Sequence, residues 1–289
     1  MTQTLLSHRA VIEIAGPDAP VFLERVLTNE VAGHPTGETR YTALLTPQGK
    51  VLVDFLIHRV TDETAPHFFL DIPASEAEAL TKRLKMFRLR ADAVITSRDD
   101  LCVWHSEDVP SASNDAICTM RDPRHEHAGF RTLRARSDSG TAPYANLAVW
   151  NAARIIIGLP EFGSDFETAK VFPADINMDL LGGIDFKKGC FVGQEVVSRM
   201  HRRGKVRKRT LLIRGAETLA TASVLNGSNA GRIGEVTSSA GNLALVRVRI
   251  DRLGKAEAAG ETFTVDDAPV TFEKPDWLQS EIAALMENG

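Results

Sequence analysis

The chain has 289 residues, of which 43% are hydrophobic and 25% are charged, a composition typical of globular proteins. That length predicts two or three domains. The formal net charge of −4 excludes a general attraction to nucleic acids. No apolar run approaches the roughly 18 residues of a membrane-spanning helix. Residues 1–9 lack the apolar core of a signal peptide, so we expect a cytoplasmic location and no membrane partner.

The cysteines are Cys102, Cys118 and Cys190. Their odd number and irregular spacing argue against a disulfide framework and indicate a reducing compartment. There is no C-x-x-C pair, so the chain alone cannot supply a four-cysteine iron–sulfur or zinc site. Any cluster that it touches would be held by one thiolate and by ligands from elsewhere.

The first 136 residues alternate between strand-like and helix-like patterns. Asp18 is placed to cap one helix, and Ser75 and Glu78 have the spacing of a capping box. Pro47 and Gly49 predict a hairpin turn between two extended runs. The predicted strands are 10–14, 39–45, 51–60, 67–71, 93–96 and 101–105, and the predicted helices start at 19 and at 75, the second ending near 87. This order predicts an α+β layer with a mostly antiparallel sheet.

The rest of the chain divides into a middle and a C-terminal region. Residues 106–124 are polar and irregular, residues 137–143 resemble a connection, and residues 146–157 have helical periodicity. The C-terminal region predicts a small β-barrel or sandwich, because short strand-like runs alternate with Gly and Asn turns before a final helix. These runs are 209–214, 232–238, 243–250, 261–265 and 270–273, and the helix is 277–286. We expect domains at 1–136, 137–205 and 206–289.

The densest motif in the chain surrounds Cys190. Within three residues of it lie two lysines and two glycines, namely Lys187, Lys188, Gly189 and Gly193. A helical pattern starts directly after Gly193, at Gln194. Neighbouring cations and a following helix N-terminus both favour a thiolate over a thiol. The alternative is that Cys190 is a small core residue without chemistry.

The helix that follows this motif starts at Gln194 and carries its own pattern. Glu195 and Arg199 are four residues apart and predict an ion pair on one helical face. Gly204 is placed to end the helix. The stretch from Arg199 to Arg209 then holds seven cations and no acid. It is either a solvated surface or an anion site for the carboxylate tail of a ligand, an acidic protein or RNA, and its lack of aromatic residues disfavours RNA.

The segment Lys188-Gly189-Cys190-Phe191-Val192-Gly193-Gln194-Glu195 resembles the K-G-C-[FY]-x-G-Q-E signature of the YgfZ family. These proteins are folate-binding relatives of the glycine-cleavage T-protein, an aminomethyltransferase, and they support iron–sulfur proteins. The resemblance covers most of the chain. It implies an α+β fold, with a T-protein-like folate-binding region of mostly antiparallel sheets followed by a small C-terminal β-barrel.

The same resemblance implies a ligand, partners and site residues. The ligand would be tetrahydrofolate, and the partners would be iron–sulfur proteins or their assembly factors, with a link to tRNA-thiolating enzymes. We expect a monomer. Asp54 falls where a T-protein carboxylate assists one-carbon transfer, and its apolar strand favours a buried, hydrogen-bonded carboxylate. Arg154 begins a segment similar to R-[LI]-E-x-G-L-P and is a second folate-binding candidate, but Ile156 replaces the glutamate that anchors the pterin ring.

Three functional hypotheses follow. The first is a folate-binding accessory protein for iron–sulfur cluster assembly or repair, with Cys190 as its reactive thiolate. The second is a tetrahydrofolate-dependent aminomethyltransferase that uses Asp54, which Ile156 disfavours. The third is a non-catalytic interaction scaffold. The motif residues of the first hypothesis are Lys187, Lys188, Gly189, Phe191, Gly193, Gln194, Glu195 and Arg199.

Overall fold

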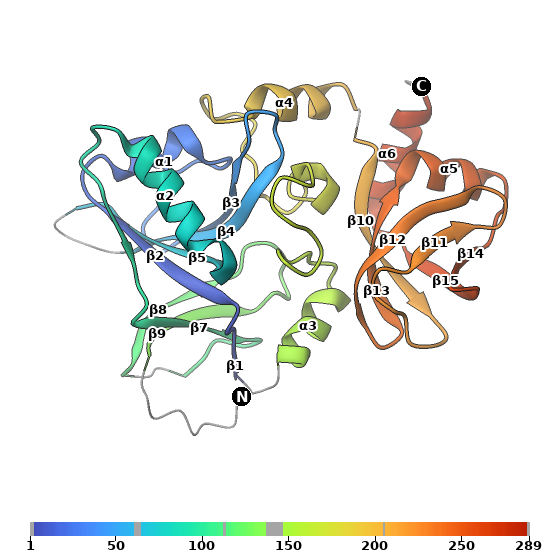
Figure 1. The fold of residues 1–289 in the computed structure, drawn as a ribbon, viewed down its shortest axis with the longest axis horizontal. Helices are drawn as coiled ribbons and strands as arrows, with labels where there is room; N and C mark the ends of the chain where they lie inside the picture. Colours follow the sequence, from blue (N-terminus) through green and yellow to red (C-terminus); the bar gives the residue numbers. More distant parts are fainter. Residues whose placement is uncertain (1–2, 61–64, 112–113, 137–146, 205, 288–289) are drawn as a thin grey trace. The chain divides into compact units, whose positions relative to one another are not determined.

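The computed structural model describes residues 3–60, 65–111, 114–136, 147–204 and 206–287, which form two compact units (Figure 1). The first unit comprises Met1–Trp150 and Leu181–Gln194, and the second comprises Asn151–Leu180 and Glu195–Gly289. The sequence assigned 137–205 to one middle region, and the two units share that stretch. The connection expected at 137–143 lies outside the described residues.

The first unit is built on two antiparallel sheets (Figure 1). The five-stranded sheet has the order β3-β4-β5-β2-β6, and the four-stranded sheet has the order β1-β7-β9-β8. The strands are β1 Gln3–Leu5, β2 Arg9–Ala15, β3 Thr39–Leu45, β4 Val51–Val60, β5 His67–Pro73, β6 Val94–Ser97, β7 Leu101–Ser106, β8 Ala116–Arg121 and β9 Phe130–Ala135. The mostly antiparallel sheet is therefore confirmed. β8 lies within the segment interpreted as irregular. It is a short edge strand on which the exposed residues Ile117, Thr119 and Arg121 alternate with more buried ones.

Two helices, α1 Ala19–Val26 and α2 Ala77–Arg88, follow strands of the larger sheet. Neither begins with the cap that the sequence predicts. The Asp18 carboxylate accepts a hydrogen bond of 2.8 Å from the backbone N–H of Asp92 instead of capping α1. Ser75 lies in a 3-10 turn, η1 Ala74–Glu76, that precedes α2, so its spacing from Glu78 does not form a capping box.

Alternation along the strands divides the first unit into three layers. Ile12 and Ile14 of β2 belong to the core beneath α1 and α2, whereas Val11 belongs to the core shared with the smaller sheet. Phe55 of β4 lies on the helix side. Because successive side chains of a strand point to opposite faces, Asp54 points away from the helices. Asp54 is nevertheless buried, with 3% of its surface exposed.

The second unit carries a closed antiparallel barrel with the order β10-β13-β12-β11-β14-β15. Its strands are β10 Lys208–Gly215, β11 Val224–Gly227, β12 Gly231–Ala240, β13 Leu243–Arg249, β14 Phe263–Val265 and β15 Ala268–Glu273. The predicted barrel is confirmed. Sequence analysis missed β11 and the helix α5 Ile250–Ala258, because α5 continues the apolar run of β13 without a break.

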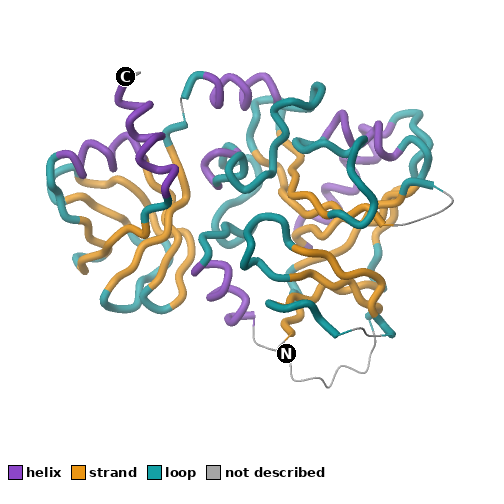
Figure 2. Tube along the Cα trace, turned by 180° about the vertical axis from the view of Figure 1, so that it is seen from behind, coloured by secondary structure: helices purple, strands orange, loops and turns teal. Residues whose placement is uncertain are grey.

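The remaining helices of the described chain are α3 Leu147–Ile156, η2 Pro173–Ile176, α4 Gln194–Arg202 and α6 Asp276–Glu287. Most of the chain between α3 and α4 is loop (Figure 2). Helix α6 packs on α5 at Gly254, where a Cβ atom would stand 2.4 Å from Cγ2 of Ile282. Within the described residues, no helix combines the length and the apolar character needed to cross a membrane.

Candidate functional site

The loop that leads to Cys190 is bound to the segment after α1. The Asn29 side-chain amide donates to the carbonyl of Gly182 at 2.7 Å, and the Thr28 hydroxyl donates to the carbonyl of Gly183 at 2.7 Å. The backbone N–H of Asp185 donates to the carbonyl of Thr28 at 3.1 Å. These bonds join positions more than 150 residues apart in the sequence, so the loop has a defined path before it reaches the motif.

Lys188 fixes the motif itself. Its ammonium donates to the backbone carbonyls of Glu24 and Leu27 at 2.8 Å and of Asn29 at 2.7 Å. A lysine ammonium has three N–H donors, so these carbonyls use all of them. Burial lowers the pKa of Lys188, and the Glu24 carboxylate at 3.4 Å opposes that effect. Lys188 therefore satisfies carbonyls at the C-terminal end of α1 and has no donor left for the sulfur of Cys190.

Gly193 fixes the other side of the motif. Its φ of +82° is a conformation that side chains disfavour, and a Cβ atom there would lie 2.5 Å from the carbonyl oxygen of Thr46. The motif thus packs directly on the turn between β3 and β4. Gly189 has no such constraint, since no atom of the described residues lies within 4 Å of the position that its Cβ would take. Phe191 is buried, with its ring centroid 5.5 Å from the Lys188 ammonium.

Cys190 is exposed between these two anchors, unlike the other cysteines. Cys102 is buried, and burial raises the pKa of Cys118 to about 12. Lys187 is exposed, and its backbone N–H donates to the Asp185 carboxylate at 2.7 Å. Cys190 is therefore the exposed cysteine of the three, and its interpretation as a core residue is wrong.

Asp54 is buried and hydrogen-bonded, as its apolar strand predicted. The Tyr41 hydroxyl donates to its carboxylate at 2.6 Å. Ala43 pairs with Asp54 across the hairpin, so Tyr41 reaches the carboxylate diagonally on the same face of the sheet. The guanidinium of Arg124 lies 5.5 Å from the Tyr41 ring centroid. Asp54 thus sits on the hairpin whose turn supports the Cys190 motif.

A buried ionic network lies on the same side of this sheet, and sequence analysis missed it. Asp71 accepts from Arg9 at 2.6 Å and from Arg131 at 3.3 Å, and Arg131 also contacts Asp122 at 3.4 Å. Asp122 binds Arg124 at 2.7 Å. Burial opposes ionisation of Asp122, but the charges of Arg124 and Arg131 outweigh it and lower its pKa to about 2. No local motif signals this network, because its members come from three different strands and a loop.

Arg154 lies in the second unit, where it binds its own segment. Its guanidinium donates to the Asp165 carboxylate at 2.7 Å and to the Leu159 carbonyl at 3.1 Å. The other oxygen of Asp165 accepts from the hydroxyls of Thr237 and Ser238 on β12. These contacts tie the loop after α3 to the barrel. Ile156, at the position of the missing glutamate, is 55% exposed.

The start of the cationic stretch agrees with the prediction, and its end does not. Glu195 and Arg199 form the predicted ion pair on the exposed face of α4. Arg209 is buried and paired with Asp179 and Glu281, so it is not part of a basic surface. Lys205 lies outside the described residues.

Two family models match the chain, one in each unit. A model described as the GCVT N-terminal domain matches residues 5–102. A model described as the CAF17 C-terminal beta-barrel domain matches residues 207–280. The order of the two models along the chain agrees with the observed order of the sheets and the barrel.

Curated relatives extend this match across the chain. A protein from Chaetomium globosum, named as a mitochondrial iron–sulfur cluster assembly factor IBA57 homolog, is 30% identical over 89% of this chain and 73% of its own length. The chain belongs to the IBA57/YgfZ family. The Mus musculus IBA57 is 29% identical over 94% of the chain and 84% of its length. The Pyricularia oryzae homolog is 36% identical over 72% of the chain, but the match covers only 56% of that protein.

This IBA57/YgfZ-family chain shares its fold with a solved aminomethyltransferase. The glycine cleavage system aminomethyltransferase T from Bartonella henselae superposes with a TM-score of 0.77 and 17% identity, over 94% of this chain and 85% of that one. The T-protein-like α+β fold is therefore confirmed. The prediction of a cytoplasmic location is wrong, because these IBA57 relatives are named as mitochondrial proteins.

Proposed function

We propose that this chain supports iron–sulfur cluster assembly by presenting the Cys190 thiolate to a cluster that it shares with a partner protein. The observation that carries this proposal is the exposure of Cys190 on a loop anchored by Lys188 and Gly193. The homology to IBA57 assembly factors gives the cluster as the cargo. Enzymes that thiolate tRNA are among the clients that the resemblance to the family implies.

The chemistry needs a partner. Among the described residues, no group of three or more His, Cys, Asp or Glu side chains could hold a metal ion. Iron in such clusters is bound by thiolates, so the Cys190 thiol must lose its proton to solvent as the sulfur–iron bond forms. The partner would supply the remaining ligands. Gln194 and Glu195 at the start of α4 are close enough in sequence to contact that partner.

A complementation assay tests this proposal. A strain that lacks the protein is supplied with wild type, Cys190→Ser or Cys118→Ser, and the activities of its iron–sulfur enzymes are measured. Cys190→Ser should fail, because a serine hydroxyl stays protonated and ligates iron poorly, whereas the matched control Cys118→Ser should complement. Full complementation by Cys190→Ser would remove the proposed role of the thiolate.

We also propose that the first unit binds tetrahydrofolate near Asp54. The match to the GCVT N-terminal domain and the T-protein-like fold support this proposal. The buried Asp54 carboxylate fits the group that assists one-carbon transfer. Ile156 does not fit the pterin-anchoring position, because its side chain has no hydrogen-bond acceptor. Arg154 belongs to the second unit, where its guanidinium pairs with Asp165, so its role as a folate contact stays a prediction from the family resemblance.

The misfit at Ile156 favours binding without efficient aminomethyl transfer. Titration with tetrahydrofolate should show saturable binding that Asp54→Asn weakens. The protein supplied with tetrahydrofolate and an aminomethyl donor should show no sustained release of methylenetetrahydrofolate. Sustained release would instead support the aminomethyltransferase hypothesis, and absence of folate binding would support the scaffold hypothesis.

A further inference from the structure

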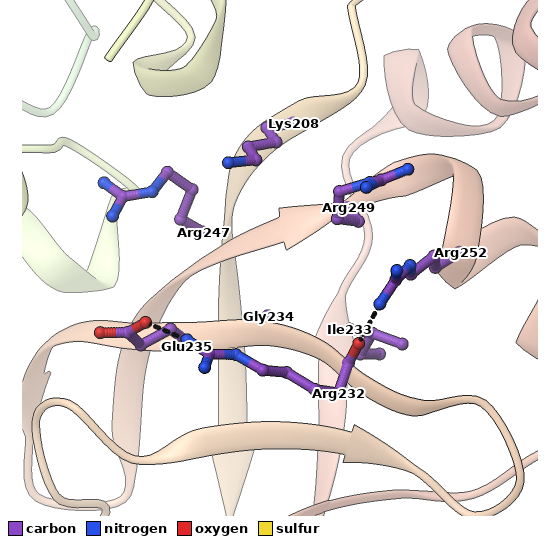
Figure 3. Close-up of a pocket in the computed structure, with 8 residues that line it drawn as sticks. All are labelled: Lys208, Arg232, Ile233, Gly234, Glu235, Arg247, Arg249 and Arg252. Carbon is purple, nitrogen blue, oxygen red and sulfur yellow. Dashed lines mark hydrogen bonds and ion pairs between the residues drawn. The ribbon is translucent and has the colours of Figure 1, made fainter. Parts of the chain in front are cut away.

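The barrel has a basic pocket that neither proposed function uses. Its volume is about 310 Å³, and Figure 3 shows its side chains around the stretch of β12 that carries Gly234. Five cations and one carboxylate line it, together with Ile233 and Gly234. The charged residues are Lys208, Arg232, Glu235, Arg247, Arg249 and Arg252.

The strand register explains why these side chains meet. Val246 and Val248 of β13 are buried in the barrel core, so Arg247 and Arg249 between and after them point outward. Lys208 of β10 lies opposite Arg249 on one side of β13. Glu235 of β12 lies opposite Arg247 on the other side. Three neighbouring strands thus place charges on one outer face.

Two of the five cations are neutralised within the pocket wall. Arg249 binds the Asp251 carboxylate, with its Nε at 2.9 Å from an oxygen, and Arg232 binds Glu235. Neither ion pair includes Lys208, Arg247 or Arg252. The excess positive charge therefore comes from the three remaining side chains.

None of those three cations forms an ion pair among the described residues, although the charges of Lys208 and Arg247 act on the buried Asp175 carboxylate. Arg247 donates to the Asp165 carbonyl at 3.1 Å, and Arg252 donates to the Arg232 carbonyl at 2.8 Å. These neutral acceptors hold the two guanidinium groups in place without cancelling their charge. Lys208 is exposed at the pocket edge. Oriented like charges repel one another, and a bound anion would relieve that repulsion.

We propose that this pocket binds the diphosphate group of a small molecule. The uncompensated cations come from β10, β13 and α5, so they approach the pocket from different directions. Two linked phosphate tetrahedra present oxygens on all sides, whereas a carboxylate presents two oxygens in one plane. An arginine guanidinium can donate two parallel hydrogen bonds to phosphate oxygens, and a lysine ammonium adds a compact positive charge. No aromatic side chain among the described residues lines the pocket, so base stacking on aromatic rings is not what would hold a ligand there.

Titration calorimetry of the full chain with inorganic pyrophosphate tests the proposal. Wild type should bind saturably, and Arg247→Gln or Arg252→Gln should each weaken binding about tenfold, as expected for loss of a charged hydrogen bond. Arg214→Gln is the matched control, because Arg214 is an exposed arginine on β10 that pairs with Glu273 outside the pocket. It should retain wild-type affinity. Circular dichroism confirms that each variant is folded.

Competing ligands make the test decisive. Citrate carries comparable charge on carboxylates and should bind at least tenfold more weakly than pyrophosphate, since its planar groups match the pocket less well. Equal binding of citrate and pyrophosphate overturns the assignment to phosphate. Equal loss of affinity in Arg214→Gln overturns the assignment to this pocket. Binding of a transfer RNA without any binding of pyrophosphate overturns the proposal in favour of a nucleic-acid surface. These binding measurements do not involve Cys190, so their outcome is separate from that of the complementation assay.

Discussion

The Lys188 ammonium donates a 2.8 Å hydrogen bond to the backbone carbonyl of Leu27, which is the residue that ends α1. The motif lysine is therefore a structural clamp between two segments that are 161 residues apart. In the sequence, Lys188 stands two residues before Cys190, which suggested a different role, that of a cation beside a thiolate. The clamp instead determines where the Cys190 loop lies, and it is the part of the motif most directly open to test.

Replacing the lysine should cost stability. Lys188→Met keeps the length of the side chain but leaves three buried carbonyls without their charged donor, so the free energy of unfolding should fall by about 2–3 kcal/mol. Urea denaturation measures this change. Lys187→Met is the control, because Lys187 is exposed and its bond within the described chain is made by its backbone N–H. It should change stability by less than about 0.5 kcal/mol. Equal effects of the two substitutions would contradict the clamp.

Cys190 should be the most reactive cysteine. An alkylating reagent near neutral pH should modify it before Cys102, which is buried, and Cys118, whose pKa burial raises to about 12. Mass spectrometry of quenched samples gives the three rates. Cys190→Ser is nearly isosteric and exposed, so its melting temperature should stay within a few degrees of wild type. If Cys190 is alkylated no faster than Cys102 and Cys118, it is not the reactive cysteine.

The Tyr41–Asp54 bond should matter for stability and for folate. Tyr41→Phe removes the hydroxyl that donates at 2.6 Å, and loss of a buried hydrogen bond to a carboxylate should lower the free energy of unfolding by about 1–3 kcal/mol. If Asp54 contacts the folate, its freed carboxylate should also change tetrahydrofolate affinity. Thermal unfolding and a folate titration measure the two effects. Unchanged affinity in both Tyr41→Phe and Asp54→Asn would separate Asp54 from any folate site.

Local patterns in the sequence were sufficient for most of the fold. The hairpin of β3 and β4 was predicted at its observed ends, because Pro47 and Gly49 mark the turn and apolar runs flank it. Helix α4 and the Glu195–Arg199 pair were predicted from helical spacing. β8 was missed because it is a short edge strand inside a polar segment, and α5 was missed because it continues an apolar strand.

Tertiary contacts account for what the sequence did not predict. The bonds of Lys188 join it to residues near position 27, and nothing in the motif indicates that partner. The Asp71–Arg131–Asp122 network likewise joins residues from separate strands. In the sequence, Arg209 is part of a cationic run. In the structure it is buried within the second unit and paired with Asp179 and Glu281. Spacing along the chain identifies residue types, but only folding selects their partners.

Two buried histidines should make stability depend on pH. Burial lowers the pKa of His34 to about 4, and Arg40 adds to that effect. Burial lowers the pKa of His105 to about 4 as well, with Arg131 adding to it. The ordinary value is 6.5, so the unfolded chain binds more protons than the folded chain between about pH 6.5 and pH 4. The free energy of unfolding therefore has its full value above pH 6.5, and it decreases as the pH falls from 6.5 to 4.

The expected loss at pH 5 is about 1–2 kcal/mol per histidine relative to neutral pH. His34→Leu should flatten this dependence, because the ring lies against Phe68 in the apolar core and leucine suits that position. His127→Gln is the control, since His127 is an exposed histidine, and it should keep the wild-type profile. Urea unfolding between pH 7.5 and pH 5 stays above the range in which Asp122 binds protons. A wild-type slope in His34→Leu would exclude His34 as a source of the pH dependence.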